Sequence, residues 1–270
     1  MKKIIFTITV AVVSLTLLAQ PQPGKDYDFA QYEKKIQVEG NDTLRYRLLL
    51  PEKMEKGKKY PLFIFFHGRG ERGSDNEQQL KHCAYRFLDE DIRKTYPSFV
   101  IFPQISLSTT SLPTNEIYSA NEASRLFWVN HPQTKMAMEL VRNMVLKGQA
   151  DPDRIYIGGL SQGGIITYAM LSTYPDWFAA AVPVCGRTSM ERIATWAKKV
   201  PAWLFCGDED AAFIDYNREM DKLLTEMKAK HKYTEYPGVG HNSWDPAFVE
   251  PELFPWIYSN AKRNNLKSFK

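Results

Sequence analysis

Cysteine is scarce in this sequence. The chain of 270 residues has three cysteines, Cys83, Cys185 and Cys206, which can form at most one disulfide. This number excludes a disulfide-based scaffold, and the spacings fit no zinc site, so we expect no metal. Cys185 and Cys206 end two segments that are predicted to be neighbouring strands. We expect free thiols even there, because strand ends rarely meet the distance and angle limits of a disulfide.

An excess of charge of one sign is also absent. Lysine and arginine together number 35, aspartate and glutamate together number 31, and the formal net charge is +4. The sequence contains no dense basic run and no internal repeat. We therefore expect no nucleic-acid partner.

Long apolar runs are absent after the first residues. Lys2 and Lys3 precede an uncharged, mostly apolar run, Ile4 to Ala19, and a polar, proline-containing stretch follows it. This order predicts a secretory signal peptide over residues 1–19 and an exported protein, periplasmic or secreted. An uncleaved membrane anchor is the alternative, but the run is shorter than the roughly 20 residues that span a bilayer. We expect no stable membrane insertion and a single domain over residues 20–270.

The rest of the chain has short apolar segments that alternate with amphipathic helical patterns. The segments rich in β-branched or aromatic residues are 44–50, 61–66, 98–102, 154–159, 179–185, 201–206 and 232–237. The clearest helical patterns run from Thr134 to Lys147 and from Tyr216 to Lys230. This alternation predicts an α/β fold with a mostly parallel central sheet and helices on both faces. The strand at 44–50 can pair antiparallel at an edge.

Polar, glycine-rich stretches follow four of the predicted strands. They are "HGRGERG" after Phe66, "LSQGG" after Gly159, "GDEDAAF" after Cys206 and "GVGHNSW" after Pro237. In such sheets, ligands bind beyond the carboxyl ends of the strands. We therefore expect the functional site at this edge.

Ser161 is the candidate nucleophile at this edge. It is the central residue of G-x-S-x-G, a common pattern by itself, but here the pattern lies between a predicted strand and a helical run, as a nucleophile elbow requires. A serine hydroxyl needs an adjacent base, and His241 is the histidine best placed for that role. The acid is expected between them in the chain, where Asp208 and Asp210 both stand; one of the two is then a solvated turn carboxylate.

The same layout predicts an oxyanion hole. Its donors are the backbone N–H of Gln162, directly after the nucleophile, and that of Arg69 in the loop after the strand at 61–66. His67 is expected to support this loop by hydrogen bonds. Glu71 and Arg72 are expected to brace it as an ion pair.

Taken together, the motifs "FFHGRGERGSDNEQQLKH", "GGLSQGG", "CGDEDAAF" and "YPGVGHNSWD" resemble a known group. The chain from Leu44 to Tyr258 is similar to the predicted-peptidase or esterase branch of the α/β-hydrolases, which is related to the phospholipase/carboxylesterase and prolyl oligopeptidase families. The resemblance implies the α/β-hydrolase fold and serine hydrolase chemistry without a metal or organic cofactor. It also implies Asp210 as the acid, three residues after Gly207, although Cys206 stands where the family often has histidine.

These features predict an exported serine hydrolase that cleaves carboxylic esters through an acyl-enzyme on Ser161. Its expected substrates are small-molecule or oligosaccharide esters, with acyl or feruloyl esters of carbohydrates suggested by analogy. The alternatives are a serine peptidase acting on short peptides and a catalytically silent binding protein on a hydrolase scaffold.

The stretch from Pro103 to Pro132 is unusually long and has no clear periodicity. Connections of this length are commonly binding loops or lids, and its apolar residues argue against a solvated linker. We predict that part of this stretch, with Trp128 and assisted by Trp244 beside His241, forms a wall of the substrate pocket. The alternative is that Trp128 packs the loop onto the core.

Overall fold

The computed structural model describes residues 26–106 and 114–270. The predicted signal peptide, residues 1–19, lies outside these ranges. Within them, every helix is too short or too polar to cross a bilayer.

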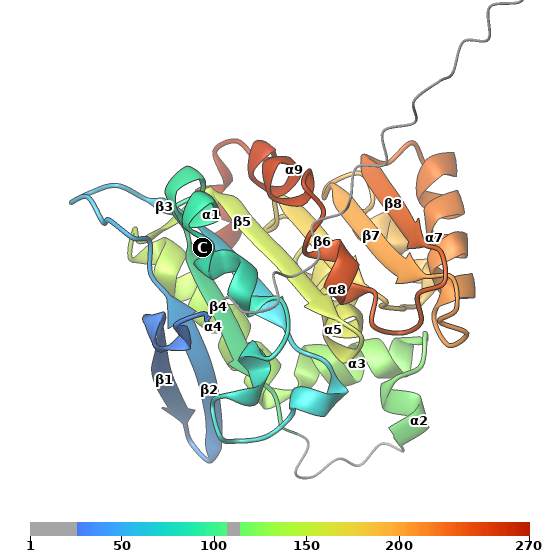
Figure 1. Cartoon of the computed structure of the whole chain (residues 1–270), viewed down its shortest axis with the longest axis horizontal. Coiled ribbons are helices and arrows are strands. Elements are labelled where there is room, and N and C mark those ends of the chain that lie inside the picture. The colour runs from blue at the N-terminus through green and yellow to red at the C-terminus, as the bar shows by residue number, and fades with distance from the viewer. Residues whose placement is uncertain (1–25, 107–113) are drawn as a thin grey trace, which may run out of the picture.

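One sheet of eight strands forms the centre of the described structure (Figure 1). Its strands, in chain order, are β1 (Tyr32–Glu39), β2 (Asp42–Leu49), β3 (Tyr60–Phe66), β4 (Phe99–Gln104), β5 (Ala150–Leu160), β6 (Ala180–Val184), β7 (Ala202–Gly207) and β8 (His231–Tyr236). Their spatial order is β1-β2-β4-β3-β5-β6-β7-β8. The order reverses around β3, which lies between β4 and β5.

The sheet is mostly parallel, which confirms the prediction. β1 pairs antiparallel with β2, and β2 pairs antiparallel with β4, whereas the remaining neighbours are parallel. The predicted antiparallel strand at 44–50 is β2. β1 was not predicted, because its outward residues Ile36 and Val38 alternate with charged or amide side chains and lie in solvent at the sheet's edge.

Helices cover both faces of the sheet. They are α1 (Glu90–Thr95), α2 (Thr114–Ile117), α3 (Glu122–Asn130), α4 (Pro132–Leu146), α5 (Gln162–Thr173), α6 (Ile193–Trp196), α7 (Ile214–Glu226), α8 (Trp244–Ala247) and α9 (Leu253–Ser259). In Figure 1, α1, α8 and α9 lie in front of the sheet, while α3, α4 and α5 lie behind it. Short 3₁₀ helices connect several elements: η1 (Phe29–Gln31), η2 (Arg69–Glu71), η3 (Gln78–Leu80), η4 (Ala84–Leu88), η5 (Met190–Arg192) and η6 (Asn265–Phe269).

Aromatic packing fills the front layer. Phe63 of β3 packs on Phe87 of η4 with ring centroids 5.2 Å apart, and Phe65 contacts Phe248 edge-on at the same separation. Phe87 also meets Phe254 of α9 at 5.3 Å. Such pairs stabilise a core beyond the area they bury. They hold the segments after β3 and after α8 on one face of the sheet.

The long stretch between β4 and α4 is more regular than its sequence suggested. Residues 107–113 lie outside the described ranges, but α2 and α3 occupy much of the remainder. Trp128 of α3 is fully buried, and its indole N–H donates to the carbonyl of Ile117 at 3.0 Å. The periodicity was missed because each helix is too short to repeat a pattern.

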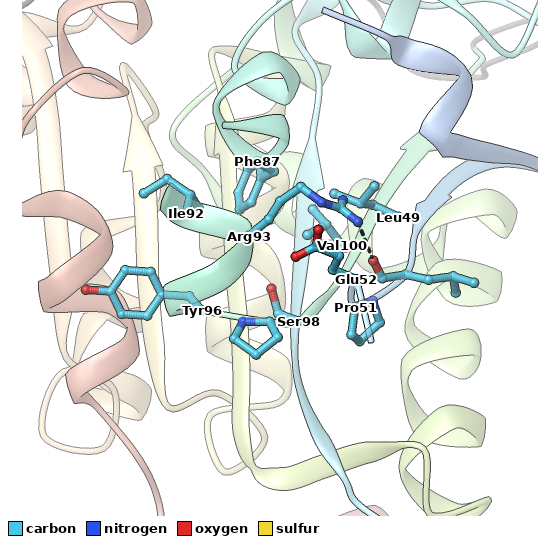
Figure 2. Close-up of a pocket in the computed structure, with 11 residues that line it drawn as sticks. Leu49, Pro51, Glu52, Phe87, Ile92, Arg93, Tyr96, Ser98 and Val100 are labelled. Carbon is cyan, nitrogen blue, oxygen red and sulfur yellow. Dashed lines mark hydrogen bonds between the residues drawn. The ribbon is translucent and has the colours of Figure 1, made fainter. Parts of the chain in front are cut away.

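A narrow hollow lies near the start of β4, where α1 meets the end of β2 (Figure 2). Arg93 of α1 donates there to the carbonyl of Leu50 at 3.4 Å, which ties the helix to the strand end. The hollow holds only about 10 Å³, which is room for about one water molecule. We therefore treat it as a packing feature.

α5 begins directly after β5 and lies unusually close to the carboxyl ends of the strands. A Cβ added at Gly163 would stand 1.9 Å from the carbonyl oxygen of Phe66, and one added at Gly159 would stand 2.3 Å from that of Gly163. A Cβ at Gly164 would stand 2.8 Å from the Cα of Gly186. The glycines around Ser161 are therefore required by backbone packing.

Replacing Gly163 with alanine should destabilise the fold strongly, because a backbone carbonyl cannot move aside as a flexible side chain can. We expect Gly163→Ala to lower the free energy of unfolding by about 3 kcal/mol or more, measured by urea denaturation. Gly240→Ala is the matched control, since a Cβ there would meet nothing within 4 Å. A Gly163→Ala protein as stable as the control would contradict the close approach of α5.

Candidate active site

Ser161 lies in the sharp turn between β5 and α5. Its backbone has φ 53° and ψ −115°, a conformation that side-chain-bearing residues rarely adopt. Its N–H donates to the carbonyl of Val184 in β6 at 2.9 Å, and its carbonyl accepts from Ile165 at 3.1 Å. These bonds hold the strained turn in place. The position of Ser161 between β5 and α5 confirms the strand–turn–helix setting that the sequence predicted.

His241 stands in the loop after β8 and reaches the serine. Its Nε2 lies 2.8 Å from Ser161 Oγ. The ring stacks on Phe213 with centroids 4.9 Å apart and meets Trp244 edge-on at 5.5 Å. About two-fifths of the side chain stays exposed (41%), so the face toward the pocket is open. The two aromatic neighbours fix the ring's orientation.

Asp210 is the carboxylate that faces the histidine. Its Oδ2 lies 2.7 Å from His241 Nδ1, and the residue is only 5% exposed. Asp208 points elsewhere, because its Oδ1 accepts from the N–H of Gly238 at 2.7 Å and closes the turn after β8. Of the two aspartates that the sequence left open, the one implied by the family resemblance lies beside His241.

The hydrogen-bond partners assign the tautomer of His241. A carboxylate only accepts, so Nδ1 carries the proton and donates to Asp210. Nε2 is then free to accept from the hydroxyl of Ser161. Asp210, His241 and Ser161 thus form one chain of hydrogen bonds, a geometry that can draw a proton from the serine.

His67 supports the loop after β3, as predicted. Its Nδ1 donates to the carbonyl of Gly68 at 2.6 Å, and its Nε2 accepts from the N–H of Ile105 at 2.8 Å. Burial lowers the pKa of His67 from 6.5 to about 4, despite the raising effect of the Gly68 bond. The ring is therefore neutral, and it fixes the loop against the end of β4.

The two predicted oxyanion-hole residues border the same pocket. Gln162 opens α5, and Arg69 opens η2. Neither backbone N–H has an acceptor among the described residues, as expected for the first residue of a helix. The predicted ion pair between Glu71 and Arg72 is not formed. Instead, Glu71 lies 3.4 Å from the ring of His82, and Arg72 Nε donates to the carbonyl of Arg69 at 2.9 Å.

A cleft of about 730 Å³ lies in front of Ser161, within the usual size of small-ligand sites. Trp244 lines it. Trp128 does not line it, which corrects its placement in the pocket. Because its indole is wholly buried and bonded to the carbonyl of Ile117, Trp128 holds α2 against α3 behind the cleft.

The sequence analysis did not single out three polar residues of this cleft, Asn115, Tyr118 and Arg187, although part of the stretch 103–132, which contains Asn115 and Tyr118, was expected to border it. The Tyr118 hydroxyl donates to Gln162 Oε1 at 3.0 Å, and the Tyr118 carbonyl accepts from Arg187 Nε. Arg187 follows the end of β6, so the rule that directed attention to the other strand ends applied to it as well. Tyr118 was covered only by the general prediction for its stretch.

Within residues 26–106 and 114–270, one set of side chains has metal-ligand chemistry. Atoms of Cys185, Asp210 and His241 lie within 4.8 Å of one another. The Cys185 thiol is buried and donates to the carbonyl of His241 at 3.5 Å. Burial raises the pKa of this thiol well above its ordinary value, and His241 Nδ1 is already bonded to Asp210. We therefore assign the set no metal role. All three cysteines are unpaired.

Comparison with known proteins identifies relatives of this chain. The sequence model of the phospholipase/carboxylesterase family matches residues 53–250. The chain is 30% identical to poly(3-hydroxyalkanoate) depolymerase C of Paucimonas lemoignei over 92 residues, which are 34% of this chain and 21% of the depolymerase. It is 23% identical to the carboxylesterase SOBER1 of Arabidopsis thaliana over 202 residues, 66% of this chain and 82% of that protein.

A solved structure of a thermostable esterase is also similar. The TM-score is 0.74 at 26% identity, and the match covers 87% of this chain and 64% of the esterase chain. The chain therefore spans less than two thirds of that esterase and about a fifth of the depolymerase (21%). The sheet topology together with these likenesses establishes the α/β-hydrolase fold.

The neutral, buried His67 should make stability depend on pH. In the unfolded chain its pKa returns to about 6.5, so between pH 6.5 and 4 the unfolded state binds the extra proton and stability falls as the pH decreases. The full difference corresponds to roughly 3 kcal/mol. Urea denaturation at pH 7 and pH 4.5 should show a larger loss for the wild type than for His67→Gln. Equal losses in the two proteins would mean that His67 is not neutral in the fold.

Proposed function

The chain belongs to the phospholipase/carboxylesterase family of α/β-hydrolases, and from this premise we propose that it is a serine hydrolase that cleaves carboxylic esters. The observation that carries the proposal is the continuous path of hydrogen bonds from Asp210 through His241 to Ser161, with links of 2.7 Å and 2.8 Å. The path opens into the cleft, where a substrate carbonyl can reach the serine.

In the first half-reaction, Ser161 Oγ attacks the ester carbonyl while His241 Nε2 takes the hydroxyl proton. Asp210 keeps the imidazole in the required tautomer and stabilises the positive charge that forms on it. His241 then gives the proton to the departing alcohol oxygen. The acyl group remains on Ser161 as an ester.

The tetrahedral intermediate carries a negative charge on the former carbonyl oxygen. The N–H groups of Gln162 and Arg69 are the proposed donors to that oxygen, since both border the cleft and have no acceptor among the described residues. One such donor is worth about 100-fold to 1000-fold in rate. Gln162 also lies at the start of α5, where the helix dipole favours negative charge.

In the second half-reaction, water attacks the acyl group on Ser161. His241 removes a proton from the water and returns it to the serine oxygen, which regenerates the hydroxyl. Every step uses side chains and N–H groups of this chain.

The similarity to proteins described as esterases favours esters over peptides as substrates. Acyl or feruloyl esters of carbohydrates are the proposed natural class. The amino-terminal pattern of Lys2, Lys3 and the apolar run to Ala19 supports an exported enzyme, periplasmic or secreted. A panel of chromogenic acyl esters, feruloylated sugars and aminoacyl anilides separates esterase from peptidase activity.

The nucleophile is tested with Ser161→Ala. The elbow is a feature of the backbone, so the variant should fold, but it should lose labelling by a fluorophosphonate probe and almost all ester turnover. Circular dichroism and thermal unfolding check the fold. Absence of labelling in the wild type would favour the silent binding protein, and retention of most activity by the variant would sink the proposed mechanism.

The two aspartates should differ sharply. Asp210→Asn removes the acceptor that fixes the tautomer of His241, so we expect turnover to fall by about a thousandfold to ten-thousandfold. Asp208→Asn is the matched control, because its carboxylate bonds the N–H of Gly238, and turnover should change by less than about threefold. Steady-state rates on one chromogenic ester decide the matter, and the reverse order of effects would reassign the acid.

A further inference from the structure

Arginines dominate the charge around the cleft. Arg69 and Arg187 line it, and Arg72 lies beside them. Among the described residues, no carboxylate lies within salt-bridge distance of any of the three. The acid that lines the cleft, Glu71, is only 6% exposed and is directed at the ring of His82. The open part of the cleft therefore carries uncompensated positive charge.

Arg187 is held in one orientation. Its Nε donates to the carbonyl of Tyr118, and its Nη1 donates to the carbonyl of Ala212 at 3.3 Å. The guanidinium also lies over the rings of Phe213 and Tyr216, at 4.9 Å and 5.7 Å from their centroids. Nη2 has no partner among the described residues. A planar group fixed in this way needs little further ordering to bind an anion.

Arg69 is the second cation of the cleft. Its guanidinium lies 5.4 Å from the ring centroid of Tyr118, whose carbonyl accepts from Arg187. Arg72 Nη1 donates to the Tyr118 hydroxyl at 3.4 Å. Tyr118 thus connects the two cations that line the cleft, and α2, which ends at Ile117, brings it there.

We propose that the preferred substrates are esters that carry a carboxylate, which Arg187 binds with Arg69 while Ser161 attacks the ester carbonyl. This inference rests on the proposed esterase function and narrows its proposed substrate class to those esters that carry a carboxylate. An anion in the cleft supplies the missing counter-charge, and a carboxylate matches the guanidinium fork. The positive potential also raises the local concentration of anionic substrates, an effect that salt weakens.

The test compares three chromogenic esters with the full-length protein. 4-Nitrophenyl butyrate is neutral, mono-4-nitrophenyl glutarate carries a carboxylate on the acyl side, and 3-carboxy-4-nitrophenyl butyrate carries one on the alcohol side. After correction for the spontaneous hydrolysis of each ester, we expect one anionic ester to exceed the neutral ester about tenfold or more in kcat/KM, the range of a charge-assisted hydrogen bond. The gain should come mainly from KM and should shrink as sodium chloride is raised. The anionic ester with the higher kcat/KM shows whether the carboxylate is bound on the acyl side or on the alcohol side.

Arg187→Met should reduce the preference for the anionic ester by about tenfold, and Arg187→Lys should restore part of it. Arg263→Met is the control, since it also removes one positive charge, from an exposed position. Arg263 lies far from the cleft. The N–H of its neighbour Lys262 donates to the carbonyl of Asp153 near the start of β5, away from the carboxyl ends of the strands. The preference of Arg263→Met should match the wild type. If Arg187 only held α2 in place, Arg187→Met would lower kcat/KM for the neutral and the anionic esters equally. The ratio of the two kcat/KM values would then stay unchanged.

Failure of this inference is distinguishable from failure of the proposed function. Turnover of the neutral ester, with Ser161-dependent probe labelling but no preference for either anionic ester, overturns the substrate class and leaves the esterase proposal standing. No turnover of any ester together with no labelling overturns both. If Arg187→Met does not fold, the preference of the wild type and its salt dependence still decide the question.

Discussion

The site depends on how closely α5 approaches the ends of β3 and β5. Gly159 and Gly163 permit this approach, since a Cβ at either position would overlap a backbone carbonyl. Ser161, between them, adopts a strained backbone with φ 53°, at a cost of about 1–3 kcal/mol. The surrounding buried strands and helix offset that cost. The result is a hydroxyl displayed at the edge of the sheet, with the first N–H groups of a helix beside it.

A second close approach fixes the partners of Ser161. A Cβ at Gly207 would stand 2.0 Å from the carbonyl oxygen of Val239, so the end of β7 touches the loop after β8. Asp208 closes the same junction through the N–H of Gly238. The side chains of Asp210 and His241 therefore meet because the backbones that carry them are in contact. Asp208 closes this junction and does not reach His241, although it lies only two residues before Asp210 in the sequence.

The features that could be predicted from the sequence are those that leave a local signal in it, such as a buried apolar strand or a glycine motif. Such strands, α4, α7 and the order of the site loops were read correctly because apolar runs and glycine motifs are local signals. β1 was not predicted, because a strand at the edge of a sheet does not need a run of apolar residues. The burial of Trp128 behind the cleft was not predicted either. Its indole N–H donates to the carbonyl of Ile117, which belongs to a helix too short to predict from sequence. The predicted ion pair of Glu71 with Arg72 was also wrong. The observed partner of Glu71 is His82, which comes close to it only when the chain folds back.

The wall of the cleft is harder to predict from sequence than the positions of Ser161, Asp210 and His241, for a physical reason. Ser161 and Gln162 are adjacent in the chain and belong to one local motif, whereas Tyr118 meets Gln162 and Arg187 only through tertiary packing. Gln162 is the point where the two parts join, since its N–H faces the developing charge in the proposed mechanism and its side chain holds Tyr118. Under the proposed function, changes in α2 or after β6 are therefore expected to alter which ester binds while the elbow stays intact. In the proposed mechanism, the fold thus separates the reacting groups, which glycine contacts position, from the proposed substrate contacts, which depend on long-range side-chain packing.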